Sequence, residues 1–365
     1  MQETLSHYFG YKSFRPGQEE IITKILNHQH TLGVLPTGGG KSICYQVPGL
    51  MQGGTTIVIS PLISLMKDQV DQLQAMGIQA AYLNSSLTHK QQKEIEERIK
   101  RGAIQFLYVA PERFENTFFL NLLRKIKIPL IAFDEAHCIS KWGHDFRPSY
   151  QSVIQKVFIL PQNFTIVALT ATATAEVQQD IMSKLSIGQN DVVKTSTKRR
   201  NLIFKVNPTY QRQKFVVDYV ANHEGQAGII YCSTRKQVEE LHEALNSEKI
   251  KSTIYHAGLT NKERIEAQND FLYDRVEVVI ATNAFGMGID KSNVRYVIHY
   301  NMPGDLESYY QEAGRAGRDG LKSECILLFS ERDKGLHEYF ITVSQADDDY
   351  KDKMGEKLTK MIQYT

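Results

Sequence analysis

Residues 35–42 read L-P-T-G-G-G-K-S, a glycine-rich segment that ends in a lysine and a serine. Glycines have no Cβ, so their backbone N–H groups can close around a polyphosphate, and a helix beginning near Ser42 adds the positive end of its dipole. Lys41 would reach the β- and γ-phosphates, and Ser42 would hold Mg²⁺. The nucleotide-binding residues predicted in this segment are Thr37, Gly38, Gly39, Gly40, Lys41 and Ser42.

The segment departs from the full phosphate-loop pattern at one position, because Leu35 stands where the pattern has its first glycine. What remains is the G-K-S core between an apolar run, residues 31–35, and a helical pattern. The alternative is a tight glycine turn with an exposed lysine. The flanking strand and helix favour the phosphate-binding interpretation.

A second group with the means to do chemistry is the acidic pair Asp134 and Glu135, which ends the apolar run L-I-A-F. Asp134 is placed to hold Mg²⁺, directly or through water, and Glu135 to orient and deprotonate the water that attacks the γ-phosphate. His137 would link the pair to its neighbours. The alternative is a solvated acidic turn. Two carboxylates that end a buried strand, downstream of a G-K-S segment, favour the catalytic interpretation.

Arg315 and Arg318 lie in the segment Q-E-A-G-R-A-G-R-D-G at residues 311–320. At this spacing they share one side of a helix or turn. Guanidinium groups offered from a second lobe can neutralise the charge of phosphoryl transfer, which predicts an arginine-finger role. Most surface arginines have no catalytic role. The arginine-finger role requires two parts of the chain to close over one nucleotide.

Tyr11, Arg15 and Gln18 surround the start of a predicted helix near the N-terminus. The amide of Gln18 offers a donor and an acceptor that match adenine at N6 and N7, and an arginine or tyrosine can stack on the base. The alternative is that these residues only cap the helix and cover its surface.

The elements that position these residues alternate between apolar runs and helical patterns. Alternating β and α elements predict an α/β protein with a mostly parallel sheet, covered on both faces, and ligands at the carboxyl ends of its strands. The strands predicted in the first part of the chain are 55–60, 80–84, 105–110, 129–134 and 165–170, with helices such as 64–76 and 90–101 between them.

The alternation pauses over residues 193–208 and then restarts, which predicts a second α/β domain and a hinge near residues 195–205. Strands are predicted there at 228–232, 253–256, 276–281, 294–300 and 324–329, with helices such as 235–247 and 262–273. An amphipathic segment, residues 350–364, follows an acidic break and either folds back on the second domain or belongs with a further domain. The predicted domains are residues 1–198, residues 199–340 and a helical tail at 341–365.

Composition narrows the class of protein. The 365 residues are 42% hydrophobic and carry a formal net charge of +2, so any nucleic-acid binding depends on local basic grooves. The four cysteines form no C-x-x-C pair, so neither zinc nor disulfides are expected. The N-terminus lacks a signal-peptide pattern, and no apolar stretch is long enough to span a membrane. A cytoplasmic protein is expected.

Taken in order, these motifs resemble the RecQ family of ATP-dependent DNA helicases, within superfamily 2, over residues 5–330. The feature that separates RecQ from its relatives is S-K-W-G-H-D-F-R-P-S-Y at residues 140–150, directly after the acidic pair. The other segments that carry the resemblance are 14–18, 36–42, 60–69, 134–137, 169–173, 230–232, 284–291 and 311–320.

The resemblance implies two tandem RecA-like domains, each a mostly parallel sheet covered by helices, with a short C-terminal helical tail. It implies that ATP and Mg²⁺ are the cofactors, and that Tyr11, Arg15 and Gln18 recognise adenine. Arg315 and Arg318 would enter from the second lobe, with Arg318 the first choice for the γ-phosphate contact. Gly288 and Asp290 resemble the element of the family that couples nucleotide to DNA.

In RecQ-like proteins the loop at residues 142–150 senses single-stranded DNA and signals to the ATP site. Aromatic side chains stack on unpaired bases at about 1 to 3 kcal/mol each, and an arginine can pair with phosphate. The alternative is that the two aromatic residues are part of the core. Hydroxyls at strand ends also suit phosphate binding. The predicted DNA-binding residues are Trp142, His144, Phe146, Arg147, Ser60 and Thr172.

The resemblance therefore implies a monomeric motor that couples ATP hydrolysis to 3′–5′ movement on single-stranded DNA and unwinds duplex DNA in recombination and repair. Its partners would be single-stranded DNA and single-strand/duplex junctions. One alternative is a related RNA helicase. The other is a DNA-binding fragment with ATPase activity and weak or no unwinding, because RecQ proteins typically continue into a four-cysteine zinc subdomain and a winged helix. Residues 350–364 resemble the helix that leads into that zinc region, which leads us to expect a truncated chain or a short form.

Overall fold

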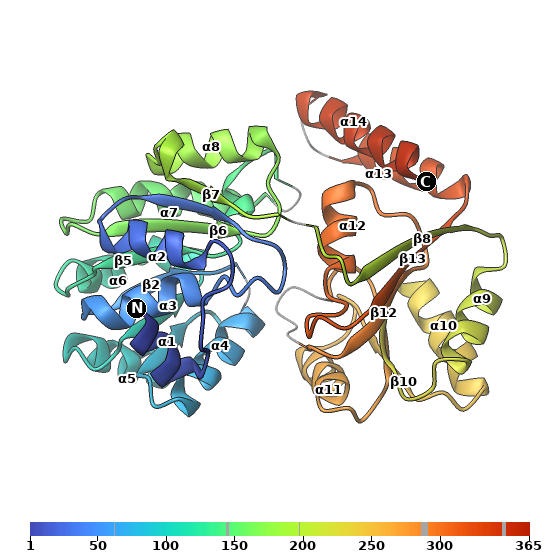
Figure 1. The fold of residues 1–365 in the computed structure, drawn as a ribbon, viewed down its shortest axis with the longest axis horizontal. Helices are drawn as coiled ribbons and strands as arrows, with labels where there is room; N and C mark the ends of the chain where they lie inside the picture. The colour runs from blue at the N-terminus through green and yellow to red at the C-terminus, as the bar shows by residue number, and fades with distance from the viewer. Residues whose placement is uncertain (62, 144–145, 197, 286–290, 345–347) are drawn as a thin grey trace. The chain divides into compact units, whose positions relative to one another are not determined.

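The computed structural model spans residues 1–365 and describes all of them except 62, 144–145, 197, 286–290 and 345–347. The chain folds as two compact units, Met1–Thr197 and Lys198–Thr365 (Figure 1). Of the predicted site residues, His144, Gly288 and Asp290 lie outside the described residues. None of the helices that the structure describes is both long and apolar enough to cross a membrane.

The first unit is built on one sheet with the strand order β3-β4-β2-β5-β6-β1-β7. Every pairing described in this sheet is parallel, as the alternating β and α pattern predicts. Most of the strands are buried along their whole length, which fits a sheet covered on both faces. The strands are β1 (Thr31–Val34), β2 (Thr56–Ile59), β3 (Ala80–Leu83), β4 (Phe106–Val109), β5 (Leu130–Phe133), β6 (Thr165–Thr170) and β7 (Val192–Lys194).

Helices cover both faces of this sheet. Successive strand residues point to opposite faces, so Ile57 and Ile59 of β2 join one hydrophobic core and Val58 joins the other. Side-chain caps fix several helix starts; Thr88 and Gln91 form a capping box at the start of α5. The helices are α1 (Gln2–Phe9), α2 (Gln18–Leu26), α3 (Ile43–Gln52), α4 (Ile63–Ala75), α5 (His89–Lys100), α6 (Thr117–Leu123), α7 (Pro148–Phe158) and α8 (Ala175–Leu185), with short 3₁₀ turns η1 (Pro111–Glu115), η2 (Ala136–Ile139) and η3 (Gln189–Asp191).

The second unit repeats this plan with the strand order β10-β11-β9-β12-β13-β8, again parallel in every described pairing. Its strands are β8 (Leu202–Pro208), β9 (Ala227–Tyr231), β10 (Ser252–Tyr255), β11 (Val278–Ala281), β12 (Val294–His299) and β13 (Ser323–Phe329). Its helices are α9 (Arg212–Ala221), α10 (Arg235–Ser247), α11 (Asn261–Leu272), α12 (Leu306–Ala313), α13 (Arg332–Val343) and α14 (Asp348–Tyr364).

The amphipathic segment near the C-terminus packs on the second unit. It forms α14, which contacts α12 and α13 and buries Leu358 and Met361 in the core of this unit. The boundary predicted after residue 340 falls within α13. Of the two alternatives for residues 350–364, the structure has the segment fold back on the second unit.

Candidate nucleotide-binding site

The glycine-rich segment joins β1 to α3 at the carboxyl end of the first sheet. Gly38 and Gly40 have φ angles of 77° and 72°, in the left-handed region that favours glycine. A Cβ at Gly40 would lie 2.5 Å from Nε2 of Gln18, so a larger residue would displace that side chain. The backbone N–H of Ile43 donates to the oxygen of Gly40 at 3.2 Å, which closes the first turn of α3 directly after Lys41 and Ser42.

Gln18 and Arg15 are bonded to the phosphate-binding segment. Nε2 of Gln18 donates to the backbone oxygens of Gly39 at 3.2 Å and Gly40 at 2.9 Å, and its Oε1 accepts from the backbone N–H of Arg15 at 2.8 Å. Nη1 of Arg15 donates to the backbone oxygen of Gly38. Gln18 is buried and Tyr11 is exposed. A hydrogen bond donated by Nε2 of Gln18 to adenine would therefore require this nitrogen to leave one of these carbonyls.

The acidic pair follows β5, as predicted from the end of its apolar run. The backbone N–H of Asp134 continues the pairing with β2 by donating to the oxygen of Ile59 at 2.9 Å. Burial raises the pKa of Asp134 to about 7, and the charge of Glu135 adds to this rise while that of Lys41 opposes it. The charges of Lys41 and Asp134 thus interact at one edge of the sheet. Glu135 has φ 47° and ψ 50°, a strained conformation for a residue with a Cβ.

His137 connects the acidic pair to the end of β6. Its Nδ1 lies 3.3 Å from Oε2 of Glu135 and 3.1 Å from Oγ1 of Thr170, and the ring is buried. Oγ1 of Thr170 also donates to the backbone oxygen of Thr172 at 2.9 Å. The segment at residues 169–173 is therefore in polar contact with the group that the sequence assigns to catalysis.

Tyr45 is a buried polar residue of this site that no sequence motif marks. Its hydroxyl lies 3.2 Å from that of Tyr108 and takes part in a hydrogen bond with Ser42. Burial raises its pKa, and the neighbouring groups Tyr108 and Asp134 add to the rise. The sequence signal is a tyrosine three residues after Ser42 on a mostly apolar helix, because a buried hydroxyl needs a partner.

Part of the predicted DNA-binding loop packs beside the end of β2. Nη1 of Arg147 donates to the backbone oxygen of Pro61 at 2.9 Å, so the structure brings Arg147 to the segment that follows Ser60. Nζ of Lys141 lies 4.0 Å from the centre of the Trp142 ring, and this ring is half-buried against the core. Phe146 and Thr172 are also half-buried, whereas Ser60 is fully buried.

The two arginines of the second unit differ in exposure. Arg315 is buried and Arg318 is half-buried. Arg315 takes part in a hydrogen bond with the hydroxyl of Tyr231, which in turn donates to the backbone oxygen of Phe285 at 3.1 Å. Burial raises the pKa of Tyr231, and the charges of Arg315 and Arg318 oppose the rise. Both arginines thus lie near the end of β9, and Arg318 is the more accessible of the two.

Comparisons with known proteins agree with this arrangement. Residues 15–181 match the family described as DEAD/DEAH box helicase, and residues 211–320 match the helicase conserved C-terminal domain. ATP-dependent DNA helicase RecQ of Bacillus subtilis is 49% identical over 364 residues, which cover 100% of this chain and 61% of that protein. Probable ATP-dependent DNA helicase RecS of the same organism is 43% identical over 353 residues, covering 95% of this chain and 70% of that protein.

Among solved structures, yeast Dbp5 bound to RNA and ADP BeF3 has a TM-score of 0.73 at 19% identity, and the match covers 98% of this chain and 97% of that one. At this identity the likeness shows the fold alone, which is that of tandem RecA-like helicase domains. The chain spans 61% of the length of the Bacillus RecQ protein. The extent and the identity of the matches to curated relatives show that the chain belongs to the RecQ family of DNA helicases.

Proposed function

We propose that the chain is an ATP- and Mg²⁺-dependent motor that moves 3′–5′ along single-stranded DNA and unwinds duplex DNA in recombination and repair. The observation that carries this proposal is the electrostatic interaction of Lys41 with Asp134, which follows β5 of the same parallel sheet. Family membership supplies the substrate class. We place the protein in the cytoplasm as a monomer that binds single-stranded DNA and single-strand/duplex junctions and does not bind membranes.

In this proposal the glycine-rich segment binds the phosphates of ATP. The left-handed conformations at Gly38 and Gly40 support it, because they open the turn without steric cost. Thr37 and Gly39 complete the turn, and the ammonium of Lys41 binds the β- and γ-phosphates. Adenine lies between Tyr11 and Arg15, with Gln18 reading its edge.

The donor set fits Mg²⁺, a hard cation that prefers oxygen ligands and retains several waters. Ser42 would supply a hydroxyl and Asp134 a carboxylate, directly or through water. The raised pKa of Asp134 supports this fit, since a buried carboxyl without a cation beside it retains its proton more readily. When bound, Mg²⁺ supplies positive charge to the β- and γ-phosphates. Glu135 orients the attacking water and takes its proton, with His137 beside its carboxylate.

The second unit contributes Arg315 and Arg318 to the same nucleotide when the two units close on it. Arg318 contacts the γ-phosphate, a role supported by its greater accessibility. Arg315 lies deeper, where its interaction with Tyr231 holds it. Gly288 and Asp290, outside the described residues, would couple the state of the nucleotide to DNA.

Single-stranded DNA binds the first unit through the loop after the acidic pair. Trp142 and Phe146 stack on bases and Arg147 pairs with phosphate, with His144, Ser60 and Thr172 contributing further contacts. The bond from Arg147 to Pro61 supports a joint surface formed by this loop and the segment after β2. Because η2 lies between this loop and Glu135, a shift of the loop on DNA reaches the catalytic carboxylate along the chain.

The test measures ATP hydrolysis with and without single-stranded DNA, and strand displacement on a tailed duplex, for the chain and for Lys41→Ala. We expect DNA to stimulate hydrolysis and Lys41→Ala to abolish it. Hydrolysis that is unchanged by DNA would contradict the motor. Stimulated hydrolysis without displacement would assign the chain a DNA-dependent ATPase activity without unwinding. Equal stimulation by RNA would favour the RNA-helicase alternative.

A further inference from the structure

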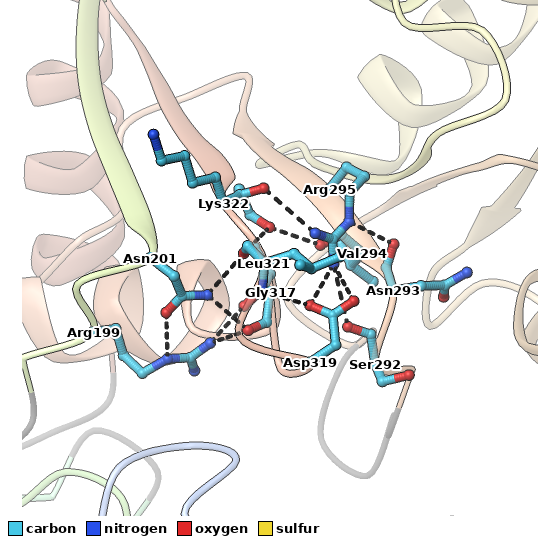
Figure 2. A network of polar contacts seen from close by, with 12 residues as sticks. Arg199, Asn201, Ser292, Asn293, Val294, Arg295, Gly317, Asp319, Leu321 and Lys322 are labelled. Atoms are coloured by element: carbon cyan, nitrogen blue, oxygen red, sulfur yellow. Dashed lines mark hydrogen bonds and ion pairs between the residues drawn. The ribbon is translucent and has the colours of Figure 1, made fainter.

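The segment that carries the two arginines is held by side chains from other parts of the second unit (Figure 2). Residues 314–321, here called the arginine loop, follow α12 and lead toward β13. Figure 2 shows Arg199 and Asn201 on one side of this loop and Arg295 on the other. The loop positions the guanidinium groups, so whatever holds the loop also sets where those groups lie.

Arg199 bonds three backbone oxygens of the arginine loop. Its Nη1 lies 3.3 Å from the oxygen of Gly314, and its Nη2 lies 3.0 Å from that of Ala316 and 2.6 Å from that of Gly317. These carbonyls follow the C-terminus of α12, where the helix dipole favours a positive charge. A planar guanidinium has five donors in a fixed arrangement, which lets one side chain bond several carbonyls at once.

Asn201 holds the middle of the same loop. Its Nδ2 donates to the backbone oxygens of Gly317 at 2.8 Å and Leu321 at 2.9 Å, and its Oδ1 accepts from Nε of Arg199 at 3.3 Å. Gly317 has φ 57°, and a Cβ there would lie 2.5 Å from Nδ2 of Asn201. The loop therefore fits against Asn201 with no space for a side chain at Gly317.

The opposite side of the loop is bonded to the start of β12. Nη2 of Arg295 lies 2.7 Å and 2.6 Å from the two carboxylate oxygens of Asp319, and its Nε donates to the backbone oxygen of Asn293 at 3.1 Å. The backbone N–H of Gly317 donates to the oxygen of Val294 at 2.9 Å. This side of the arginine loop is thus bonded to the start of β12, and the other side is bonded to Arg199 and Asn201, which directly precede the edge strand β8.

Arg199 also has a distinctive place in the chain. The first unit ends at Thr197 and the second begins at Lys198, so Arg199 is the second residue of the second unit. We propose that Arg199 is a positioning residue for ATP hydrolysis, which holds the arginine loop so that Arg318 is set for the γ-phosphate. This inference rests on the proposed function. It makes the orientation of the arginine loop depend on the residues that open the second unit.

The first test measures hydrogen exchange of the backbone amides in the nucleotide-free chain, so it does not depend on hydrolysis. It compares Arg199→Lys with Arg200→Lys, the same change at the neighbouring exposed arginine. A lysine has a single nitrogen in place of the Nε, Nη1 and Nη2 that make these bonds, so it cannot reproduce the network. We expect exchange in residues 314–321 to rise by about tenfold or more in Arg199→Lys and not in Arg200→Lys. Unchanged exchange in this loop would overturn the proposal.

The second test measures ATPase kinetics with single-stranded DNA. In Arg199→Lys we expect kcat to fall about 10- to 100-fold, with KM for ATP changed by less than about threefold, because ATP binding to the first unit is untouched. In the background of Arg318→Ala, the same change should lower kcat by less than about twofold, since its effect acts through Arg318. If Arg199→Lys lowers kcat equally with and without Arg318→Ala, the proposal is overturned. That result is also the one expected if Arg199→Lys only reduces the amount of folded protein. If Arg318→Ala alone leaves kcat unchanged, the proposed role of Arg318 fails, and the exchange experiment still decides whether Arg199 holds the loop.

Discussion

The side-chain amide of Gln18 donates to the backbone oxygen of Gly40 at 2.9 Å, and both groups lie in the first unit next to the phosphate-binding segment. In the proposed function the same amide reads adenine. Where Nε2 donates to adenine, adenine and the phosphate-binding segment compete for its two hydrogens. The proposed role of Gln18 would therefore couple nucleotide binding to the conformation of residues 38–40.

Gln18→Glu tests this coupling, because it replaces Nε2 with an oxygen that faces the carbonyls of Gly39 and Gly40. We expect the preference for ATP over GTP to disappear and the free energy of unfolding to fall by about 1 to 3 kcal/mol, the usual effect of leaving buried polar groups unsatisfied. Nucleotide competition binding and denaturant unfolding measure the two effects. Glu19→Gln, at the neighbouring exposed position, is the control. Unchanged selectivity together with unchanged stability would contradict the coupling.

Asp134→Asn tests the raised pKa of Asp134. This pKa is about 7 in the folded chain and near its model-compound value of 3.8 in the unfolded chain. Between about pH 4 and pH 7 the unfolded chain loses this proton while the folded chain retains it, so rising pH favours unfolding. The destabilisation of the folded chain is fully present above about pH 7.

Without Mg²⁺, Asp134→Asn should therefore stabilise the chain at pH 8 and have little effect at pH 4. The measurement is the thermal unfolding of both proteins in chelator across this range. Asp71→Asn, at an exposed carboxylate of the same unit, controls for the loss of one charge. A stability difference that does not grow with pH would contradict the assignment. Added Mg²⁺ with nucleotide should stabilise the original chain and reverse the order at pH 8.

The central strands of both sheets could be predicted from the sequence, because strands buried on both faces are continuous apolar runs. The predicted strand at 165–170 coincides with β6, and that at 129–134 contains β5. The edge strands β7 and β8 lie largely within residues 193–208, where the sequence pattern predicts a pause in the alternation and a hinge. In β8 the buried Leu202 is followed by the exposed Ile203, since an edge strand buries only part of its surface.

The meeting of Lys41 with the acidic pair could also be predicted, because the carboxyl ends of parallel strands share one edge of a sheet. The bonds from Gln18 to Gly40 and from Arg199 to Gly317 could not. Each joins a side chain to a backbone carbonyl distant in sequence. Every residue has a backbone carbonyl, so residue types do not indicate which one accepts the bond. The predicted loop at 142–150 likewise ends earlier than expected, because Pro148 begins α7.

Gly317→Ala tests the fit between the arginine loop and Asn201. The new Cβ would combine the strain of a positive φ angle with contacts of 2.5 Å to Nδ2 of Asn201 and 2.8 Å to both the backbone oxygen of Leu321 and Oγ of Ser323. Gly320→Ala is a matched control, since Gly320 also has a positive φ of 86° but open space around its Cβ position. We expect the positive φ to cost each variant about 1 to 2 kcal/mol, Gly317→Ala to lose further stability through its close contacts, and only Gly317→Ala to lower kcat about tenfold or more. Equal kcat values for the two variants would contradict the fit.

Arg147→Ala separates phosphate binding from loop support. If Arg147 pairs with a DNA phosphate, its removal weakens binding to single-stranded DNA and reduces the dependence of log K on log salt concentration by about 0.7. If Arg147 acts only by its 2.9 Å bond to Pro61, affinity falls while the salt dependence stays the same. We expect the first result, because Arg147 lies in the loop with the aromatic residues Trp142 and Phe146. Binding titrations with oligo-dT at several salt concentrations measure both quantities, and Arg124→Ala controls for the loss of an exposed cation elsewhere in the unit. If Arg147→Ala binds DNA as tightly as the original chain, Arg147 is not part of the DNA-binding surface.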